Sequence, residues 1–315
     1  MEKRQLGQSS LHVPPLCIGG NVFGWTADES TSFELLDACF DAGLTFIDTA
    51  DVYSKWVQGN TGGESESIIG RWMKERGNRD RLVIATKGGQ EMPYGKGLSK
   101  AHIRMAVDAS LKRLQTDYID LYQSHTDDAA TPLEETLGAY AELIQAGKIR
   151  FIGASNYTAE RLKEALDISA RNSLPRYESL QPEYNLYNRA GYESALEPLC
   201  RDNEIGVIPY YALASGFLTG KYRSEQDFGK SPRGGSMGKY LNARGLRILK
   251  ALDEVTEKHK ATPAQVSLAW LMARPGLTAP IASATKLAQV KDLAASTALR
   301  LDGPDIEALN QASAA

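Results

Sequence analysis

The chain has 315 residues, of which 42% are hydrophobic and 24% charged, with a formal net charge of -3. This composition is typical of a globular protein with a substantial core and excludes a disordered chain. Because acidic and basic residues are mixed along the sequence, nothing favours a nucleic-acid or membrane-surface partner, and we expect a small-molecule ligand.

Short apolar runs alternate along the chain with longer segments that have the apolar spacing of helices. The expected strands are, in chain order, 16–18, 44–47, 82–85, 119–122, 150–153, 179–181, 206–209 and 278–281. The expected helices between them are 29–42, 64–75, 99–114, 133–145, 158–169 and 193–202. Ser99 and Thr158 stand at helix N-cap positions, and Gly43 and Gly147 end helices just before the next strand.

Eight such units predict a parallel sheet covered by helices, and the usual closed form of that sheet is the α/β (β/α)8 TIM barrel. We expect residues 1–315 to form one such domain. An open doubly wound sheet is the alternative, but it normally carries a GxGxxG turn, which the sequence lacks. Residues 1–13 predict a β-hairpin plugging the bottom of the barrel, and residues 212–246 a long loop after the seventh strand.

Two further features bear on where the protein works. The N-terminal residues 1–15 lack the apolar run of a secretory signal, and no later run reaches the length of a membrane span, so we expect a cytoplasmic protein. The cysteines, Cys17, Cys39 and Cys200, are far apart without CxxC spacing. They predict buried free thiols rather than disulfides or a zinc site.

Side chains that can transfer protons follow three consecutive expected strands. Asp48 and Tyr53 follow the second strand, Lys87 the third and His125 the fourth. Barrel enzymes have their active sites at the C-terminal ends of the strands, so these side chains should meet at one rim. Each residue alone has a structural explanation, such as a turn cap or a solvated strand end. Their coincidence at consecutive strand ends favours a catalytic group.

This group suits proton transfer to a polarised oxygen. Lys87 is expected to lower the pKa of Tyr53 by stabilising its phenolate, and Asp48 to be the counter-ion of Lys87. His125 is expected to orient a substrate oxygen by a hydrogen bond. The absence of an HExxH motif or a dense His/Cys/Asp cluster argues against metal hydrolysis. Carbonyl reduction fits these residues, given a source of hydride.

Several motifs are similar to those of the aldo-keto reductase family, NADP-dependent (β/α)8-barrel oxidoreductases. The segment from Asp48 to Tyr53, with Lys87 and His125, resembles the catalytic tetrad of that family. Further matches run in family order: GLTFIDTA at 43–50, GASN at 153–156, QPEYN at 181–185 and GFLTGKY at 216–222. The resemblance implies an enzyme that transfers hydride between NADP(H) and a carbonyl or alcohol substrate, with Tyr53 as general acid/base.

The resemblance also implies a cofactor site. Ser155, Asn156 and Gln181 resemble the residues that hold the nicotinamide carboxamide, and Tyr210 the aromatic residue that stacks on the ring. The lysines in the phosphate-binding segments favour NADP(H) over NAD(H). The implied cofactor-binding residues are Gly20, Asn21, Asp48, Ser155, Asn156, Gln181, Tyr210, Ala212, Leu213, Ser215, Gly216, Lys221, Ser283, Thr285, Lys286 and Gln289.

The substrate pocket should be walled by Val22, Trp25, Tyr53, Trp56 and His125, with Tyr94 and residues 223–241 as further candidates. The two tryptophans suit an aromatic or otherwise apolar carbonyl compound. One alternative is a cofactor-binding, redox-sensing regulatory module of the same fold. Another is a cofactor-free barrel lyase, for which the sequence offers only Lys87 as a Schiff-base residue.

Overall fold

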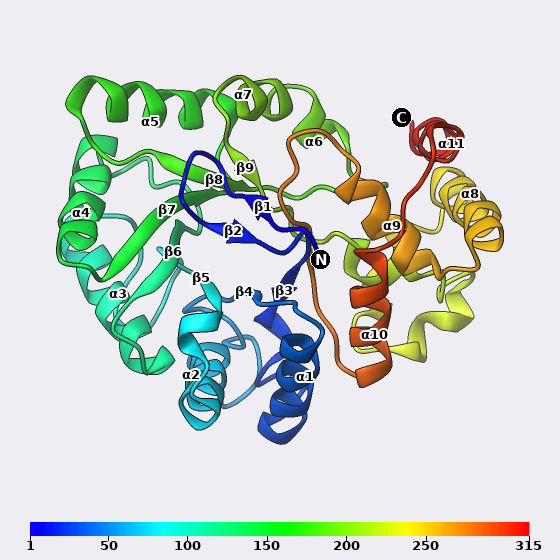
Figure 1. Cartoon of the computed structure of the whole chain (residues 1–315), viewed down its shortest axis with the longest axis horizontal. Helices are drawn as coiled ribbons and strands as arrows, with labels where there is room; N and C mark the ends of the chain where they lie inside the picture. Colours follow the sequence, from blue (N-terminus) through cyan, green and yellow to red (C-terminus); the bar gives the residue numbers. More distant parts are fainter. Residues whose placement is uncertain (315) are drawn as a thin grey trace.

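A ring of parallel strands surrounded by helices forms the centre of the computed structural model, which describes residues 1–314 (Figure 1). The sheet has eight strands in the order β10-β3-β4-β5-β6-β7-β8-β9, and each neighbouring pair is parallel. The strands are β3 (Cys17–Gly19), β4 (Phe46–Asp48), β5 (Val83–Gly88), β6 (Ile119–Ser124), β7 (Ile149–Ser155), β8 (Tyr177–Gln181), β9 (Gly206–Val207) and β10 (Ile281–Ala282).

The sheet closes on itself between β9 and the segment that leads into β10. The N–H of Thr278 donates to the carbonyl of Val207 at 2.9 Å, and the N–H of Ile281 donates to the carbonyl of Pro209 at 2.9 Å. Val207 also forms a parallel bridge with Leu277. These hydrogen bonds join the two ends of the sheet, so the expected (β/α)8 barrel is confirmed.

Helices cover the outside of the barrel. They are α1 (Glu29–Asp41), α2 (Glu64–Arg76), α3 (Lys100–Leu114), α4 (Leu133–Gln145), α5 (Ala159–Asn172), α6 (Ala190–Glu193), α7 (Leu196–Asp202), α8 (Ala243–His259), α9 (Pro263–Met272), α10 (Leu287–Ser296) and α11 (Gly303–Ser313). The expected helix 193–202 is wrong in extent, because α6 ends at Glu193 and α7 begins at Leu196. Pro198 lies in the first turn of α7, where its missing N–H breaks no intrahelical hydrogen bond.

The helix boundaries follow the capping residues expected from the sequence. The hydroxyl of Ser99 accepts a hydrogen bond from the N–H of His102 at 3.4 Å, and Thr158 caps α5 in the same way. Gly43 and Gly147 have φ values of 78° and 72°. This left-handed conformation favours glycine and ends α1 and α4 ahead of the next strand.

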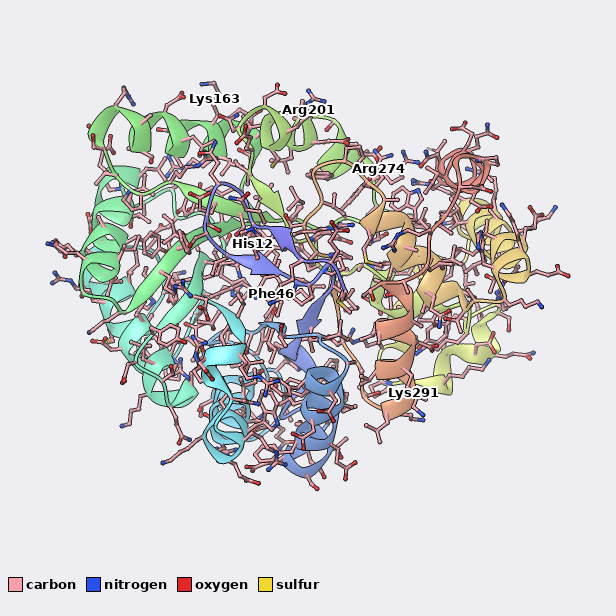
Figure 2. The ribbon with its side chains drawn as sticks, viewed as in Figure 1. His12, Phe46, Lys163, Arg201, Arg274 and Lys291 are labelled. Atoms are coloured by element: carbon pink, nitrogen blue, oxygen red, sulfur yellow. The ribbon has the colours of Figure 1, made fainter. Side chains whose placement is uncertain are left out.

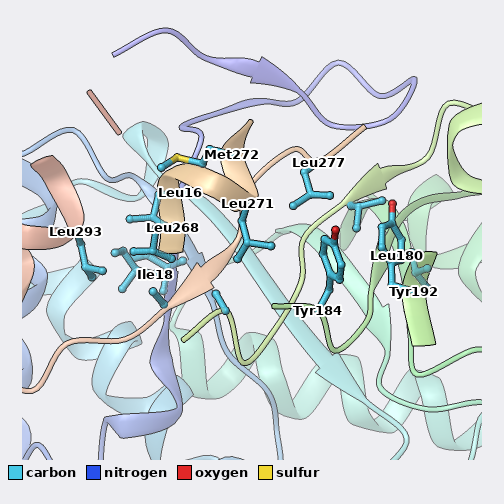
Figure 3. Close-up of a cluster of buried hydrophobic side chains, with 14 of the residues drawn as sticks. Leu16, Ile18, Leu180, Tyr184, Tyr192, Leu268, Leu271, Met272, Leu277 and Leu293 are labelled. Carbon is cyan, nitrogen blue, oxygen red and sulfur yellow. The ribbon is translucent and has the colours of Figure 1, made fainter. Parts of the chain in front are cut away.

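The apolar core has two layers. The outer layer lies between strands and helices, where Leu16 and Ile18 pack with Leu268 of α9 (Figure 3). The inner layer fills the barrel itself and contains Phe46, Leu121 and other strand residues. Strands such as β4 and β6 are therefore apolar on both faces, which explains their continuous apolar runs in the sequence. The cysteines are buried free thiols, as expected.

The N-terminal hairpin plugs the end of the barrel at which the strands begin. Its strands, β1 (Arg4–Gln5) and β2 (His12–Val13), pair antiparallel and lie across the ring in Figure 1. Leu6, Leu11 and Val13 are buried in the inner core. A Cβ on Gly7 would lie 2.3 Å from the carbonyl oxygen of Glu178 in β8, so only glycine permits this approach. The expected plug is confirmed.

The expected long loop 212–246 after β9 contains short 3-10 helices, η3 (Ala214–Thr219), η4 (Glu225–Lys230) and η5 (Gly234–Lys239). Two other 3-10 helices, η1 (Gly20–Val22) and η2 (Arg79–Arg81), precede β4 and β5 respectively. The end of the expected loop is wrong, because α8 already begins at Ala243. The side chain of Asn242 caps this helix by accepting a hydrogen bond from the N–H of Gly245 at 3.0 Å.

Several charged side chains on the covering helices point away from the barrel. Lys163 of α5, Arg201 of α7 and Lys291 of α10 lie at the periphery and are exposed (Figure 2). Among the helices of residues 1–314, none combines the length and the apolarity that crossing a membrane requires.

We expect truncation of the hairpin plug to destabilise the barrel. Leu6→Ala should lower the free energy of unfolding by about 2–5 kcal/mol, because it leaves a cavity in the inner core. Urea denaturation would measure this loss. Leu246→Ala removes the same atoms from a side chain that is 48% exposed and serves as the control. Equal losses in both variants would contradict the role of the plug.

Candidate active site

The buried ion pair of Asp48 and Lys87 forms the floor of the candidate site. Asp48 ends β4 and Lys87 lies in the neighbouring β5, so both side chains reach the C-terminal end of the barrel. The ammonium of Lys87 donates to the two carboxylate oxygens at 2.8 and 2.7 Å and to the carbonyl of Thr49 at 2.7 Å. Both side chains are 1% exposed. All three donors of the ammonium are thus satisfied, which offsets the cost of burying it.

Two buried amides complete the surroundings of Asp48. Its Oδ1 accepts hydrogen bonds from Nε2 of Gln123 at 3.1 Å and from Nε2 of Gln181 at 2.9 Å. The Gln181 amide also donates to Oε1 of Gln123 at 3.1 Å. Gln123 was not predicted from the sequence. Strand alternation could have identified it, because Gln123 lies two residues before His125 and residues two apart share one face of a strand.

Tyr53 and His125 lie directly beside this ion pair. The Tyr53 hydroxyl is 3.5 Å from Oδ2 of Asp48, and the Lys87 ammonium is 4.8 Å from the centre of the Tyr53 ring. The rings of Tyr53 and His125 have centres 6.1 Å apart. The structure therefore brings together the residues that the sequence placed at three consecutive strand ends.

The protonation of Tyr53 differs from the expectation. Burial, followed by the nearby Asp48 carboxylate, raises the pKa of Tyr53 well above its ordinary value. The expected lowering of the Tyr53 pKa by Lys87 is wrong for the protein without ligands. The Lys87 ammonium is hydrogen bonded to both carboxylate oxygens of Asp48, so the nearly neutral pair stabilises a Tyr53 phenolate only weakly.

His125 is held as a neutral ring. Burial, followed by the positive charge of Lys87, lowers the pKa of His125 well below its ordinary value. The side chain of Asn156 donates to the backbone carbonyl of His125 at 3.0 Å and fixes the end of the strand. The Nδ1 atom of the ring is buried and has no hydrogen-bond partner within residues 1–314. A neutral imidazole has one N–H and can donate one hydrogen bond to a ligand.

A cavity of about 1130 Å³ opens above these residues. Two predicted site residues do not line it: Lys87 lies beneath the floor, and Gly20 packs against Ser65 and the Asp48 carbonyl. Of the further candidates, Tyr94 instead donates to a carboxylate oxygen of Asp51. The predicted residues on the wall are Asn21, Val22, Trp25, Asp48, Tyr53, Trp56, His125, Ser155, Asn156, Gln181, Tyr210, Ala212, Leu213, Ser215, Gly216, Lys221, Ser283, Thr285, Lys286 and Gln289.

One wall of the cavity is polar and internally hydrogen bonded. The Ser155 hydroxyl donates to the carbonyl of Gln181 at 2.9 Å, and the Asn156 amide donates to the Ser155 hydroxyl at 3.1 Å. The Tyr210 hydroxyl donates to Oδ1 of Asn156 at 2.9 Å. Asn156 has a φ of 56°, a conformation that asparagine tolerates better than most residues. These contacts fix the orientation of the amides before any ligand binds.

Another part of the wall carries cations without partners. Across residues 1–314, Lys221, Lys286 and Arg233 form no ion pair with a carboxylate, and all three line the cavity. A Cβ on Gly216 would lie 3.5 Å from the Lys221 ammonium, so the absence of a side chain at Gly216 leaves the space next to the ammonium open. Unpaired cations in a concave site suit an anionic ligand such as a phosphate.

The backbone beside these cations is strained. Ala214, Ser215 and Gly216 have successive φ values of 47°, 56° and 102°. Non-glycine residues in this conformation cost on the order of 1–3 kcal/mol each, and such residues cluster at ligand-binding sites. Of the candidate segment 223–241, Ser231, Pro232, Arg233 and Ser236 line the cavity. Tyr211 was not predicted from the sequence, because loop residues carry no periodicity that would mark their direction.

The cavity mouth is aromatic. The rings of Trp25 and Trp56 have centres 5.6 Å apart, and those of Tyr53 and Trp56 are 6.0 Å apart. The Arg233 guanidinium lies 5.0 Å from the ring centre of Trp25. Tyr211 also lines the cavity. Within the described part of the chain, no group of three or more His, Cys, Asp or Glu side chains is placed to hold a metal ion.

Comparison with known proteins gives a consistent result. Residues 15–314 match the sequence model of the Aldo/keto reductase family. The uncharacterized oxidoreductase YrpG of Bacillus subtilis is 35% identical, over 98% of this chain and 95% of that protein. L-glyceraldehyde 3-phosphate reductase of Escherichia coli strain K12 is 33% identical, over 93% and 86%. A probable voltage-gated potassium channel subunit beta of Oryza sativa subsp. japonica is 35% identical, over 92% and 89%.

We expect the two halves of the buried ion pair to depend on each other. Asp48→Asn should lower the free energy of unfolding by about 3–5 kcal/mol, because it leaves the Lys87 ammonium buried without a counter-ion. The double variant Asp48→Asn with Lys87→Met should recover part of this loss. Denaturant unfolding of the single and double variants measures the coupling. Simple additivity of the losses would contradict it.

Proposed function

The chain belongs to the aldo/keto reductase family, and we propose that it transfers hydride between NADP(H) and a carbonyl or alcohol substrate, with Tyr53 as general acid/base. The family and its oxidoreductase relatives support a general oxidoreductase role. The observation that carries the proposal is the meeting of Tyr53, the Asp48–Lys87 pair and His125 on the floor of one cavity.

In this proposal the protein supplies the proton and the orientation of the substrate. The raised pKa of Tyr53 keeps its phenol protonated at neutral pH, as a proton donor to a carbonyl oxygen must be. The neutral ring of His125 donates a hydrogen bond to the same oxygen and aims it at Tyr53. The Asp48–Lys87 ion pair holds the floor of the cavity in place beneath Tyr53 and His125.

The cavity residues fit NADP(H), which supplies the hydride when bound. Ser155, Asn156 and Gln181 present hydroxyl and amide groups of the kind that satisfy a carboxamide, and Tyr210 offers a flat face for the ring. The cations on the wall suit the phosphates. NADP(H) carries a 2′-phosphate that NAD(H) lacks, so the unpaired Lys221 and Lys286 favour NADP(H).

The walls near Tyr53 indicate the kind of carbonyl compound. Val22, Trp25 and Trp56 present mostly apolar surface, and Trp56 is 50% exposed at the mouth. We propose an aromatic or otherwise apolar carbonyl substrate of small size.

A regulatory module of the same fold is the second candidate. It is favoured by the similarity to a protein named as a potassium channel subunit beta. Both candidates bind the cofactor, so binding does not distinguish them. Turnover does: tight NADPH binding without consumption of NADPH on a panel of aldehydes would support the regulatory module and contradict the enzyme.

We expect Tyr53→Phe to lower kcat for aldehyde reduction by roughly a hundredfold to ten-thousandfold, because it removes the proton donor. NADPH binding, followed by protein fluorescence, should stay unchanged, since Tyr53 is assigned no cofactor contact. Steady-state oxidation of NADPH measures the rate. A Tyr53→Phe variant with full turnover would disprove the assignment.

Replacing the lysines should change the choice of cofactor. Lys221→Ala and Lys286→Ala should each weaken NADPH binding by roughly tenfold, through loss of a charge-assisted contact to phosphate. At least one of these substitutions should weaken NADH binding much less than NADPH binding, because only NADPH carries the 2′-phosphate. Fluorescence titration with both cofactors provides the comparison. Lys230→Ala, which removes an exposed lysine that pairs with Asp227, is the control.

A further inference from the structure

Asp51 is a buried acid close to the site that has no part in the proposed reaction. Its side chain is 0% exposed. Asp51 is the second residue of a turn in which the N–H of Tyr53 donates to the carbonyl of Ala50 at 3.2 Å. The N–H of Asp51 itself donates to the carbonyl of Lys87 at 3.0 Å. Asp51 is thus built into the segment that positions Tyr53.

The side chain of Asp51 contacts a loop from the next strand. Residues 89–98 follow β5, and the Tyr94 hydroxyl in this loop donates to Oδ2 of Asp51 at 3.0 Å. No hydrogen-bond donor among residues 1–314 reaches Oδ1 of Asp51. The hydrogen bond from Tyr94 is therefore the side-chain contact that joins this carboxyl group to the loop.

The loop reaches the cavity and the segment that carries Tyr53. Gln90 lines the cavity wall. The Lys55 ammonium donates to the carbonyl of Glu91 at 2.5 Å, which adds a second link between the two segments. The N–H of Gly97 donates to the carbonyl of Gly89 at 2.9 Å and closes the base of the loop. A change in the Asp51–Tyr94 contact would consequently alter the wall beside Tyr53.

Asp51 shares its surroundings with a second acid and a single cation. The Arg113 guanidinium donates to Oε2 of the buried Glu66 at 2.6 Å, and in the described structure Asp51 has no ion pair of its own. Burial and then the Glu66 charge raise the pKa of Asp51 to about 7. The titratable and charged groups that face Asp51 or its partner Tyr94, from α2, α3 and β6, are Glu66, His102, Arg113 and Tyr122.

We propose that Asp51 and Tyr94 form a pH-sensitive latch that fastens the 89–98 loop to the segment carrying Tyr53, which makes Asp51 a positioning residue of the site. Ionised Asp51 accepts a charge-assisted hydrogen bond from Tyr94, and protonation removes that charge. The latch is closed above neutral pH and loosened below it. Its effect on turnover rests on the proposed function, whereas the latch itself does not.

Ionisation of Asp51, which closes the latch, lowers the stability of the fold because the carboxylate is buried. The pKa of Asp51 is higher in the folded chain than its ordinary value in the unfolded chain, so protonation stabilises the fold. That contribution is complete at acid pH and is lost as the pH rises through about 7. An asparagine would avoid the loss at every pH. The carboxyl group therefore provides a charge-dependent contact at the expense of stability.

Infrared spectroscopy and amide hydrogen exchange test the latch without any turnover. A band of protonated carboxyl should titrate near pH 7 in the native protein and be absent from Asp51→Asn. In Tyr94→Phe its midpoint should rise by about one pH unit, because the hydrogen bond that favours the ionised form is lost. Exchange of residues 89–98, corrected for the intrinsic pH dependence, should be slower at about pH 8 than at about pH 6 in the native protein but not in Asp51→Asn or Tyr94→Phe.

Tyr184→Phe is the matched control. It removes a phenol that donates to a carboxylate oxygen of Glu193 at 2.6 Å, away from the 89–98 loop, and should leave both readouts as in the native protein. The pH profile of kcat/KM should lose an inflection near neutrality in Asp51→Asn and Tyr94→Phe. A carboxyl band that titrates only at acid pH, or unchanged loop exchange in Tyr94→Phe at high pH, would overturn the latch. Absence of turnover with both readouts intact would contradict only the proposed function.

Discussion

The site depends on a salt bridge buried inside the barrel. Asp48 and Lys87 are both almost completely buried, and an unpaired charge at that depth would cost several kcal/mol. Two adjacent parallel strands place the carboxylate and the ammonium side by side, and the amides of Gln123 and Gln181 complete the hydrogen bonding. The surrounding apolar core excludes water and makes every one of these contacts stronger.

Burial and this pair together explain the protonation of the neighbouring groups. Burial, followed by the Asp48 carboxylate, raises the pKa of Tyr53, whereas burial, followed by the Lys87 ammonium, lowers the pKa of His125. Asp51 has no ion pair of its own, and burial, followed by the Glu66 charge, raises its pKa to about 7. Residues a few positions apart in sequence thus differ in protonation because their surroundings differ.

The sequence predicted the barrel, the hairpin plug and the polar residues at the strand ends, because all three rest on local patterns such as continuous apolar runs and the ionisable residues that follow them. It could not predict the sign of the pKa change of Tyr53, which depends on the burial of the phenol and on the hydrogen bonds of the Lys87 ammonium to Asp48. Nor could it predict the contact between Asp51 and Tyr94, which joins loops 43 positions apart without periodicity. Gln123 could have been predicted from strand alternation, whereas Tyr211, in the irregular segment after β9, could not.

The N-terminal hairpin has a consequence for the traffic of ligands. Leu6, Leu11 and Val13 seal one end of the barrel, and the inner core fills the space between that seal and Asp48. The cavity is therefore closed on the side of the hairpin and opens at the strand C-termini. A molecule that reaches Tyr53 cannot pass through the barrel and must leave on the side from which it came, past any other ligand in the cavity. Such a geometry imposes a sequence of arrival and departure on two ligands that share it.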